Sequence, residues 1–304
     1  MSWSGNSEGG SPISAETASS AVLPLSSRLM ENLYGPILWL CGVIGMALPL
    51  GIIGYMLANG LGVLSKDFIL GNLAGVPLGS AGGIRPALAG TLALAGAGLA
   101  LAFPFALGGA LFLTEYGKPS SLFCRACLGA AECMAAIPAI IYGLFGYAAF
   151  VVFLGWQISL RAGVITLALM MYPVILIGCR AALAGVPDQY REAALSLGVS
   201  RFYVIRRVLL PKAWPGIVSG TILALGHAAS AAAPVLFTAS VFFSRGSVSM
   251  KEPVMTLPTH LYFLVTEALS FPYAFGTACV LIFIMLAANV CAMAARHLGR
   301  RHRQ

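Results

Sequence analysis

Hydrophobic residues in this chain form long runs that are separated by short polar stretches. About 20 residues at a rise of about 1.5 Å per residue cross a hydrocarbon core of about 30 Å, so each run is long enough to span a membrane as a helix. The fifth run is longer than one crossing requires and contains Pro234. The pattern predicts an all-α polytopic membrane protein with six transmembrane helices, at residues 37–57, 87–113, 137–154, 160–182, 214–243 and 272–294.

The stretch at residues 121–155 is also longer than one crossing and contains Pro138. Because proline bends a helix, we expect an interfacial helical start that leads into the span at 137–154. Arg125 and Glu132 in that start are seven residues apart and share a helix face. We expect them to form an interfacial ion pair, and an intramembrane charge site is the alternative.

The composition supports a membrane protein. Charged residues make up 9% of the chain and hydrophobic residues 59%, with a mean hydropathy of +0.89, whereas a soluble domain carries about 25% charged residues. This deficit implies that apolar surface faces lipid. The net charge of +8 comes from basic residues that cluster beside the apolar runs. Lipid headgroups and the positive-inside rule explain this clustering, so we expect contact with membrane lipid and no binding of nucleic acid.

Polar and basic segments divide the chain into four regions. Residues 1–30 are rich in Ser, Gly and Ala and lack an early apolar run, which predicts a disordered tail and not a signal peptide. Residues 31–86 hold the first span and a Gly-rich loop, residues 87–296 form a core of five spans, and residues 297–304 form a basic tail. Within the core, residues 187–212 are the longest polar and basic interruption.

The distribution of Lys and Arg orients these regions. Six spans place both termini on the same side of the membrane. With the loops assigned accordingly, 13 of the 18 Lys and Arg residues lie on the side of the termini and of residues 187–212. The positive-inside rule therefore places both termini and this segment in the cytoplasm, and the loop of the region 31–86 in the periplasm.

Residues 187–212 are predicted to form two short helices joined at a glycine. The first helix starts after Pro187 and is broken at Gly198, and the second meets Pro211. The spacing fits the pattern EAA-x3-G-x9-I-x-LP, with Val208 in the isoleucine position. This pattern resembles the coupling loop of ABC-importer permeases. The residues that match it are Glu192, Ala193, Ala194, Gly198, Leu210 and Pro211.

The resemblance implies a role for each part of the pattern. The two alanines would let the first helix seat in a groove of a cytoplasmic ATPase, and Glu192 would offer its charge to basic groups there. Gly198 would allow the sharp turn between the helices. An ordinary basic cytoplasmic loop with helical propensity is the alternative.

Four further stretches narrow the resemblance to one family. They resemble the GGI-x-PAL-x-GTL, P-S-I-V-Y-G-L-F-G, A-P-L-L-F-T-A and Met-Ser-Leu-Pro patterns of phosphate-importer permeases, and the last two are typical of the PstA-type subunit. In this chain they are residues 82–92, 137–146, 233–239 and 255–258. The resemblance implies the MetI-like fold of type-I ABC importers in the cytoplasmic (inner) membrane. It also implies a PstC-type permease subunit, two cytoplasmic ATPase subunits and a periplasmic phosphate-binding protein as partners.

The chain departs from this family in its fifth span. Where the family reads R-A-I-G-E-T-A-P, this chain has His227 in place of the Arg and Ala231 in place of the Glu. Because intramembrane charges usually mark a solute path, His227 and Ser230, on one helix face, are the candidate residues of the translocation path. The alternatives are a helix–helix hydrogen bond for His227 and close packing for Ser230. Import of another oxyanion, or a sensor that no longer transports, stands beside phosphate import.

Motifs for catalysis are absent from the sequence. It has neither the Gly-x4-Gly-Lys-Ser/Thr loop that cradles phosphates nor a His-Glu-x-x-His motif, and its four histidines are scattered. Cys124 and Cys127 are the one tight cysteine pair, and we interpret them as packing residues and not as a metal site. We expect neither enzyme activity nor a cofactor in this chain, because a partner subunit uses the ATP. A membrane-embedded enzyme that uses Cys124, Cys127 and Glu132 is the alternative.

Overall fold

The computed structural model describes residues 25–301 except 76–80, 119 and 243–248. The chain divides into two compact units, residues 1–52 and 53–304. Helix α1 (Leu25–Gly60) begins in the first unit and contains Pro36 and Pro49. Almost all side chains at positions 34–52 are exposed, as suits a helix that faces lipid. The predicted disordered tail lies outside the described residues as far as residue 24.

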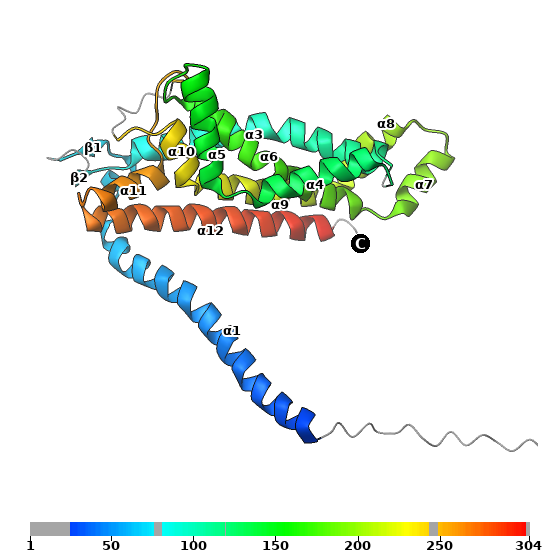
Figure 1. Cartoon of the computed structure of the whole chain (residues 1–304), viewed down its shortest axis with the longest axis horizontal. Helices are drawn as coiled ribbons and strands as arrows, with labels where there is room; N and C mark the ends of the chain where they lie inside the picture. The colour runs from blue at the N-terminus through cyan, green and yellow to red at the C-terminus, as the bar shows by residue number, and fades with distance from the viewer. Residues whose placement is uncertain (1–24, 76–80, 119, 243–248, 302–304) are drawn as a thin grey trace, which may run out of the picture. The chain divides into compact units, whose positions relative to one another are not determined.

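The second unit is built almost entirely of helices (Figure 1). It opens with η1 (Leu61–Val63), α2 (Lys66–Leu70) and the short antiparallel strands β1 (Leu73–Ala74) and β2 (Ala81–Gly82). The bundle continues with α3 (Arg85–Leu111) and its π-helical extension η2 (Phe112–Tyr116), α4 (Leu122–Ala136), α5 (Ala139–Gly146) with the π-helical η3 (Tyr147–Phe153), and α6 (Leu160–Ala184). The remaining elements are α7 (Asp188–Ser196), α8 (Arg201–Val204), the π-helical η4 (Ile205–Leu209), α9 (Leu210–Ala229), α10 (Ala232–Thr238), α11 (Leu257–Thr266) and α12 (Phe271–Arg301).

Among the described residues, five helical segments are long and apolar enough to cross a membrane: Tyr34–Val63, Arg85–Tyr116, Leu160–Ala184, Arg201–Ala229 and Phe271–Ala295. The bent pair α4–α5 is a sixth if it is counted as one span. Four of the six predicted spans lie inside these segments. The prediction of an all-α protein with multiple spans is therefore confirmed.

The predicted bend at Pro138 is confirmed, and it divides residues 121–155 into two helical halves. The chain bends beside Pro138, where α4 and α5 meet at 97°. α4 has 15 residues, and the second half has 8 in α5 and 7 in η3, so at about 1.5 Å per residue either half alone is shorter than a membrane crossing. Figure 1 shows α4 running alongside α6, while α5 turns across the bundle. It is therefore α4, predicted to be interfacial, that follows the direction of the other spans.

The predicted span at 214–243 is wrong in its bounds. The helical segment starts at Arg201 and ends at Ala229. Ala231 is extended, with ψ 104°, and the chain restarts as the short helix α10 with Pro234 in its first turn. Proline is tolerated there because the first N–H groups of a helix have no partner within it. The long apolar run is therefore two helices.

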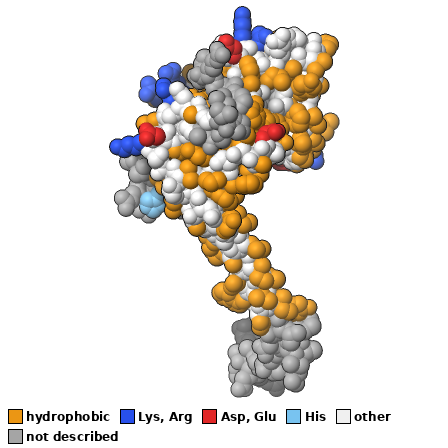
Figure 2. Space-filling view, turned by 90° about the vertical axis from the view of Figure 1, so that its left-hand side faces the viewer, with side chains coloured by type: hydrophobic (Ala, Val, Ile, Leu, Met, Phe, Trp, Pro, Cys, Tyr) orange, Lys and Arg blue, Asp and Glu red, His pale blue; other side chains and the backbone are white. Residues whose placement is uncertain are grey.

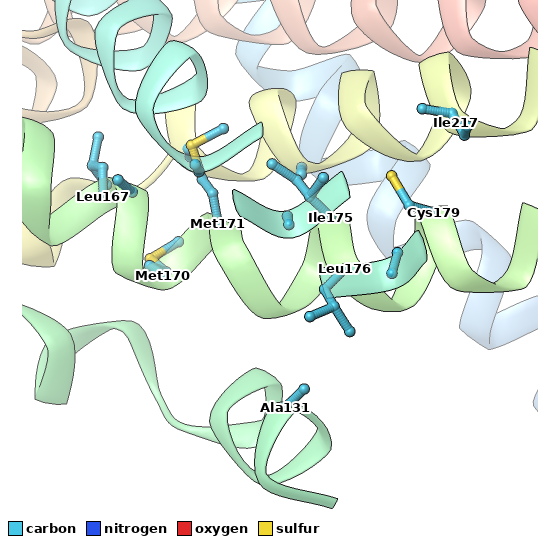
Figure 3. Close-up of a cluster of buried hydrophobic side chains, with 14 of the residues drawn as sticks. Ala131, Leu167, Met170, Met171, Ile175, Leu176, Cys179 and Ile217 are labelled. Carbon is cyan, nitrogen blue, oxygen red and sulfur yellow. The ribbon is translucent and has the colours of Figure 1, made fainter. Parts of the chain in front are cut away.

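Helix α6 forms the centre of the second unit. It packs against α3, α4, α5, α9 and α10, and 67% of its most apolar 18-residue window is buried. Figure 3 shows Leu167 and Ile175 of α6 inside this core, with Ile217 of α9 on one side. Small residues bring α6 close to α9, since a Cβ added to Gly178 would lie 3.5 Å from the Cα of Gly220. In lipid, such close packing drives helix association in place of the hydrophobic effect.

Apolar side chains cover much of the outer surface of the second unit. Figure 2 shows hydrophobic side chains over the flanks, with charged side chains scattered over the end that faces the viewer. Large exposed side chains occur on α3, α5, α9 and α12, among them Leu92, Phe145, Trp214 and Phe283. A surface of this kind suits a hydrocarbon environment.

The first and the last of the four permease-like stretches contact each other. Gly90 lies against the carbonyl group of Met255 and leaves no room for a Cβ. Beside it, the hydroxyl of Thr91 accepts a hydrogen bond from the backbone N–H of Leu257 at 2.8 Å. The start of α3 is thereby joined to the start of α11.

The two middle stretches also contact each other. A Cβ on Gly143 of α5 would lie 2.8 Å from the Cα of Pro234 in α10. One turn later, Gly146 lies against the side chains of Thr166 and Thr238. The glycines in these stretches are therefore sites of close backbone approach. Their positions in the sequence match the points where α5 packs against α10 and α6.

Replacement of Gly90 by alanine should destabilise the protein by about 1–3 kcal/mol, because the new methyl group would overlap the Met255 carbonyl. The matched control is Gly96→Ala on the same helix, where no atom lies within 4 Å of an added Cβ. That variant should be neutral or more stable by up to about 1 kcal/mol, since alanine favours the helix. Thermal unfolding in detergent measures the difference, and equal midpoints for the two variants would contradict the close contact.

Candidate functional site

Residues 187–212, which we call the elbow, form two helices at one end of the bundle. The first, α7, ends before Gly198, which adopts a left-handed φ of +74° and turns the chain. The second starts at Arg201 with Ser200 as its N-cap. The predicted helix–glycine–helix shape is therefore confirmed. Figure 1 shows α7 and α8 projecting from the end of the bundle opposite β1, β2 and α11.

The outer face of α7 carries the first half of the predicted motif. Glu192 and Ala193 are exposed, and Ala194 is half-buried against the main core. None of the residues of α7 is buried. Glu192 forms no ion pair with another described residue. The elbow therefore presents a carboxylate next to a small side chain, on a helix that projects from the bundle.

The second half of the elbow is anchored in the apolar core. Val204, Ile205 and Leu209 are all buried there. Leu210 is half-buried against the same core and Pro211 is exposed, in the first turn of α9. The Leu-Pro end of the motif therefore marks the point where the elbow enters the bundle.

Arg191 holds α7 against the bundle, and reasoning from the sequence did not select it as a site residue. Its Nη2 and Nε donate to Oε1 of Glu115 at 2.9 and 3.1 Å. Its Nη1 donates to Oδ1 of Asp188 at 2.6 Å. The carbonyl oxygens of Val186 and Leu183 accept from Nη1 and Nη2 at 2.9 and 3.0 Å. One side chain thus joins α7 to the ends of η2 and α6.

The Arg191–Glu115 ion pair is largely shielded from solvent, with 17% and 11% of the two side chains exposed. Partial burial acts to lower the pKa of Arg191, but the hydrogen bond and charge of Glu115 outweigh it. The pKa of this guanidinium is therefore raised, and the group stays charged. Both residues line a pocket of about 440 Å³ between the end of η2 and the elbow, together with Thr114, Leu195 and Arg201.

A second contact ties α7 to α9. The Lys212 ammonium lies 3.7 Å from the centroid of the Tyr190 ring, within the range of a cation–π interaction. Tyr190 belongs to α7, and Lys212 lies in the first turn of α9. The two arms of the elbow are therefore connected across the turn at Gly198.

The second candidate site, His227 and Ser230, lies at the other end of α9. Leu210 and His227 are 17 positions apart, which is about 26 Å of helix, so the fold does not bring this site to the elbow. Both side chains are exposed. Ser230 Oγ donates to the His227 carbonyl at 3.0 Å, and the imidazole of His227 forms no hydrogen bond with another described residue. The helix–helix hydrogen bond considered for His227 is therefore absent from the described part of the chain.

The backbone unwinds directly after this site. α9 ends at Ala229, and the chain is extended at Ala231 before α10 begins. At membrane depth, irregular backbone is tolerated where it is buried in protein or lines a water-filled cavity. Broken helices of this kind hold solute sites in transporters. The break therefore lies beside the two exposed side chains of His227 and Ser230.

The predicted ion pair between Arg125 and Glu132 is wrong. Both side chains are exposed, and neither has an ion-pair partner among the described residues. Seven residues correspond to about 10 Å along a helix, too far for direct contact. Cys124 is buried against Gly117 and Cys127 is half-buried, both as free thiols. The described residues contain no group of three or more metal-ligating side chains.

Residues 117–303 match the family model described as "Binding-protein-dependent transport system inner membrane component". The chain is 30% identical over 292 residues to the probable ABC transporter permease protein YqgI of Bacillus subtilis, covering 90% of this chain and 95% of that protein. It is 34% identical over 226 residues to the phosphate transport system permease protein PstA 1 of Mycobacterium tuberculosis, covering 74% and 73%. It is 33% identical over 222 residues to a probable phosphate transport system permease protein PstA of Methanocaldococcus jannaschii, covering 72% and 76%.

Two solved structures have a similar fold at low sequence identity. A subunit of a bacterial ABC transporter involved in the import of alginate superposes with a TM-score of 0.57 and 19% identity, covering 91% of this chain and 98% of that one. A chain of the MetNI methionine ABC transporter in an inward-facing conformation superposes with a TM-score of 0.56 and 19% identity, covering 68% and 93%. At this identity the likeness concerns the fold alone.

Proposed function

The chain belongs to the binding-protein-dependent transport system inner membrane component family, and on that premise we propose that it is a PstA-type permease subunit that moves inorganic phosphate. It is a multi-pass inner-membrane permease subunit of an ABC importer, with the type-I importer fold and without catalytic activity of its own. As such it assembles with ATPase subunits and a periplasmic binding protein. For this chain, the proposed partners are a PstC-type permease, two cytoplasmic ATPase subunits and a phosphate-binding protein.

The elbow is the observation that carries the proposal of an ATP-driven machine. Its first helix projects from the bundle with Glu192 and Ala193 exposed, and Gly198 makes the turn that this shape requires. A projecting helix with one carboxylate and small side chains fits a groove on a soluble partner. The excess of basic residues on this side supports a cytoplasmic location for the elbow and both termini, the side on which the ATPase subunits are proposed to bind.

The elbow is continuous with the proposed path. From Arg201 to Ala229 the chain is one helical segment that starts in the elbow and ends beside His227. A displacement of the elbow would therefore move α9 as a rod and shift the broken backbone at its far end. Small residues at the contact of α9 with α6, such as Gly178 and Gly220, leave a smooth surface for this movement. In this way ATP-driven closure of the ATPases would switch the permease between its inward-open and outward-open states.

Phosphate is supported by relatives whose names state phosphate transport, at 33–34% identity over more than two thirds of this chain. His227 supplies a donor that can carry positive charge beside an anion at the position of the family's arginine. Because Ala231 stands where the family has an acidic residue, import of another oxyanion is the second candidate. The two candidate functions, import of phosphate and import of another oxyanion, share one mechanism and differ only in the solute.

Uptake into vesicles that contain the assembled complex distinguishes the two candidates. Labelled phosphate should accumulate with ATP, and unlabelled phosphate should compete better than sulfate or molybdate. His227→Ala should reduce uptake about tenfold, equivalent to about 1.4 kcal/mol, because the anion loses a donor. Leu223→Ala, an exposed position one turn earlier on α9, is the control and should stay within about twofold of the native rate. If phosphate is neither taken up nor competes, the phosphate assignment is wrong.

Variants of the elbow test its coupling role without regard to the solute. Glu192→Lys should prevent ATPase copurification and reduce transport more than about tenfold, since it reverses the exposed charge. Gly198→Pro should do the same, because proline fixes φ near −65° and cannot adopt the observed turn. Gln189→Lys adds positive charge to the same exposed helix and should have little effect. Normal transport in both elbow variants, with normal insertion, would remove the assigned role.

A further inference from the structure

The two helices of the elbow are attached to the bundle by different forces. α8 and η4 place Val204, Ile205 and Leu209 in the apolar core. α7, by contrast, has no buried residue. Hydrophobic burial therefore contributes little to holding α7 in place, and its polar contacts set its position.

Arg191 supplies most of these polar contacts. Within the described residues, it is the side chain of α7 that forms hydrogen bonds outside its own helix, to Glu115 on η2, to the carbonyl of Leu183 in the last turn of α6 and to that of Val186 just after α6. Asp188, its remaining partner, lies on α7 itself and is 82% exposed. The contact with the Leu183 and Val186 carbonyls joins neighbours in the chain, because α7 follows α6 directly. The contact with Glu115 joins elements that are 76 positions apart.

The pair has the geometry of a rigid joint. Nη2 donates to Oε1 of Glu115 at 2.9 Å, and Nε donates to Oε1 at 3.1 Å and to Oε2 at 3.4 Å, so both carboxylate oxygens are engaged and the orientation is fixed as well as the distance. Both charged groups are largely buried, so removal of one partner leaves the other charge uncompensated. The pair therefore favours movement of α7 and η2 together over their separation.

Glu115 is placed where a displacement can act on the whole of α3. η2 extends α3 without a break, and α3 has 27 residues, about 40 Å of helix. Its other end is docked through Gly90 and Thr91 onto Met255 and Leu257. A push on Glu115 is therefore carried along α3 to the opposite end of the bundle.

We propose that the Glu115–Arg191 ion pair is the joint through which α7 moves α3, so that both are positioning residues for transport. The proposal rests on the proposed function, because it requires that an ATPase drives the elbow. It adds a second route for that movement: η4 and α9 transmit it through apolar packing, and Arg191 transmits it to α3 through charge. Loss of the joint should uncouple α3 and leave ATPase docking on the exposed face of α7 intact.

The test uses the complete complex with its ATPase subunits in lipid vesicles, comparing native protein with Glu115→Gln, Arg191→Lys and Asp188→Asn. Hydrogen exchange is measured at α7 and at the first turns of α3, with and without ATP and vanadate. In the native complex both regions should respond to nucleotide. In Glu115→Gln and Arg191→Lys the response at α7 should remain, the response at α3 should be lost, and transport per ATP should fall about tenfold, within the usual range of coupling between sites.

Asp188→Asn is the matched control, because it removes an ion pair of Arg191 that does not leave α7. It should keep both responses and normal transport per ATP. A response at α3 that persists in Glu115→Gln and Arg191→Lys overturns the joint and leaves the elbow's role untouched. Absence of any nucleotide response at α7 in the native complex would instead overturn the proposed function.

A double-mutant cycle separates a specific pair from general damage. If the two residues act as one joint, Glu115→Gln combined with Arg191→Lys should uncouple transport no further than either change alone. If the double variant instead lowers transport per ATP by the product of the two single effects, each residue acts independently, and the proposal is overturned. Should Glu115→Gln fail to insert, Glu115→Asp keeps the charge and shortens the reach. That variant should reduce transport per ATP while the response at α7 persists, and unchanged coupling would count against the joint.

Discussion

The close approach of helix backbones at small residues is the constraint on which this structure depends. A helix satisfies its own backbone hydrogen bonds in lipid, so contacts between helices rely on packing. α6 meets α9 where Gly178 faces Gly220, and α5 meets α10 where Gly143 faces Pro234. A Cβ at Gly143 would lie 2.8 Å from the Cα of Pro234 and would push those two helices apart, whereas a Cβ at Gly178 would just reach van der Waals contact with Gly220 at 3.5 Å. Gly90 has the same role at the start of α3, where a backbone carbonyl occupies the space of a Cβ.

Against this apolar framework, the elbow stands out as the place where charge replaces packing. Arg191 and Glu115 form a shielded ion pair at the end of the bundle, and Glu192 one residue further along α7 is exposed. Glu115 thus forms an ion pair within the molecule, whereas the carboxylate of Glu192 is exposed on its surface. This division fits a helix that has to bind a partner on one face and transmit force from the other.

The sequence predicts the elbow well because its signals are local. A proline, a glycine at a left-handed φ and an N-cap serine define two short helices wherever they stand. The sequence predicts where the chain bends, at Pro138. It does not predict the direction of the bend, because the residues on both sides of the proline are apolar. The same ambiguity hides the break at Ala231. The partnership of Glu115 and Arg191 leaves no local signal, since 76 positions separate them and only the fold brings them together.

π-Helical segments lie at both attachments of the elbow to the bundle. η2 carries Glu115, and η4 connects α8 to α9. Extra residues within a helical turn weaken its regular hydrogen bonding, and π-segments occur frequently at functional sites. Both routes by which the elbow reaches the bundle therefore begin in a π-helical segment. The long helices that adjoin these segments, α3 and α9, both pack against α6, so a displacement of either at the elbow acts on the contacts with the central helix.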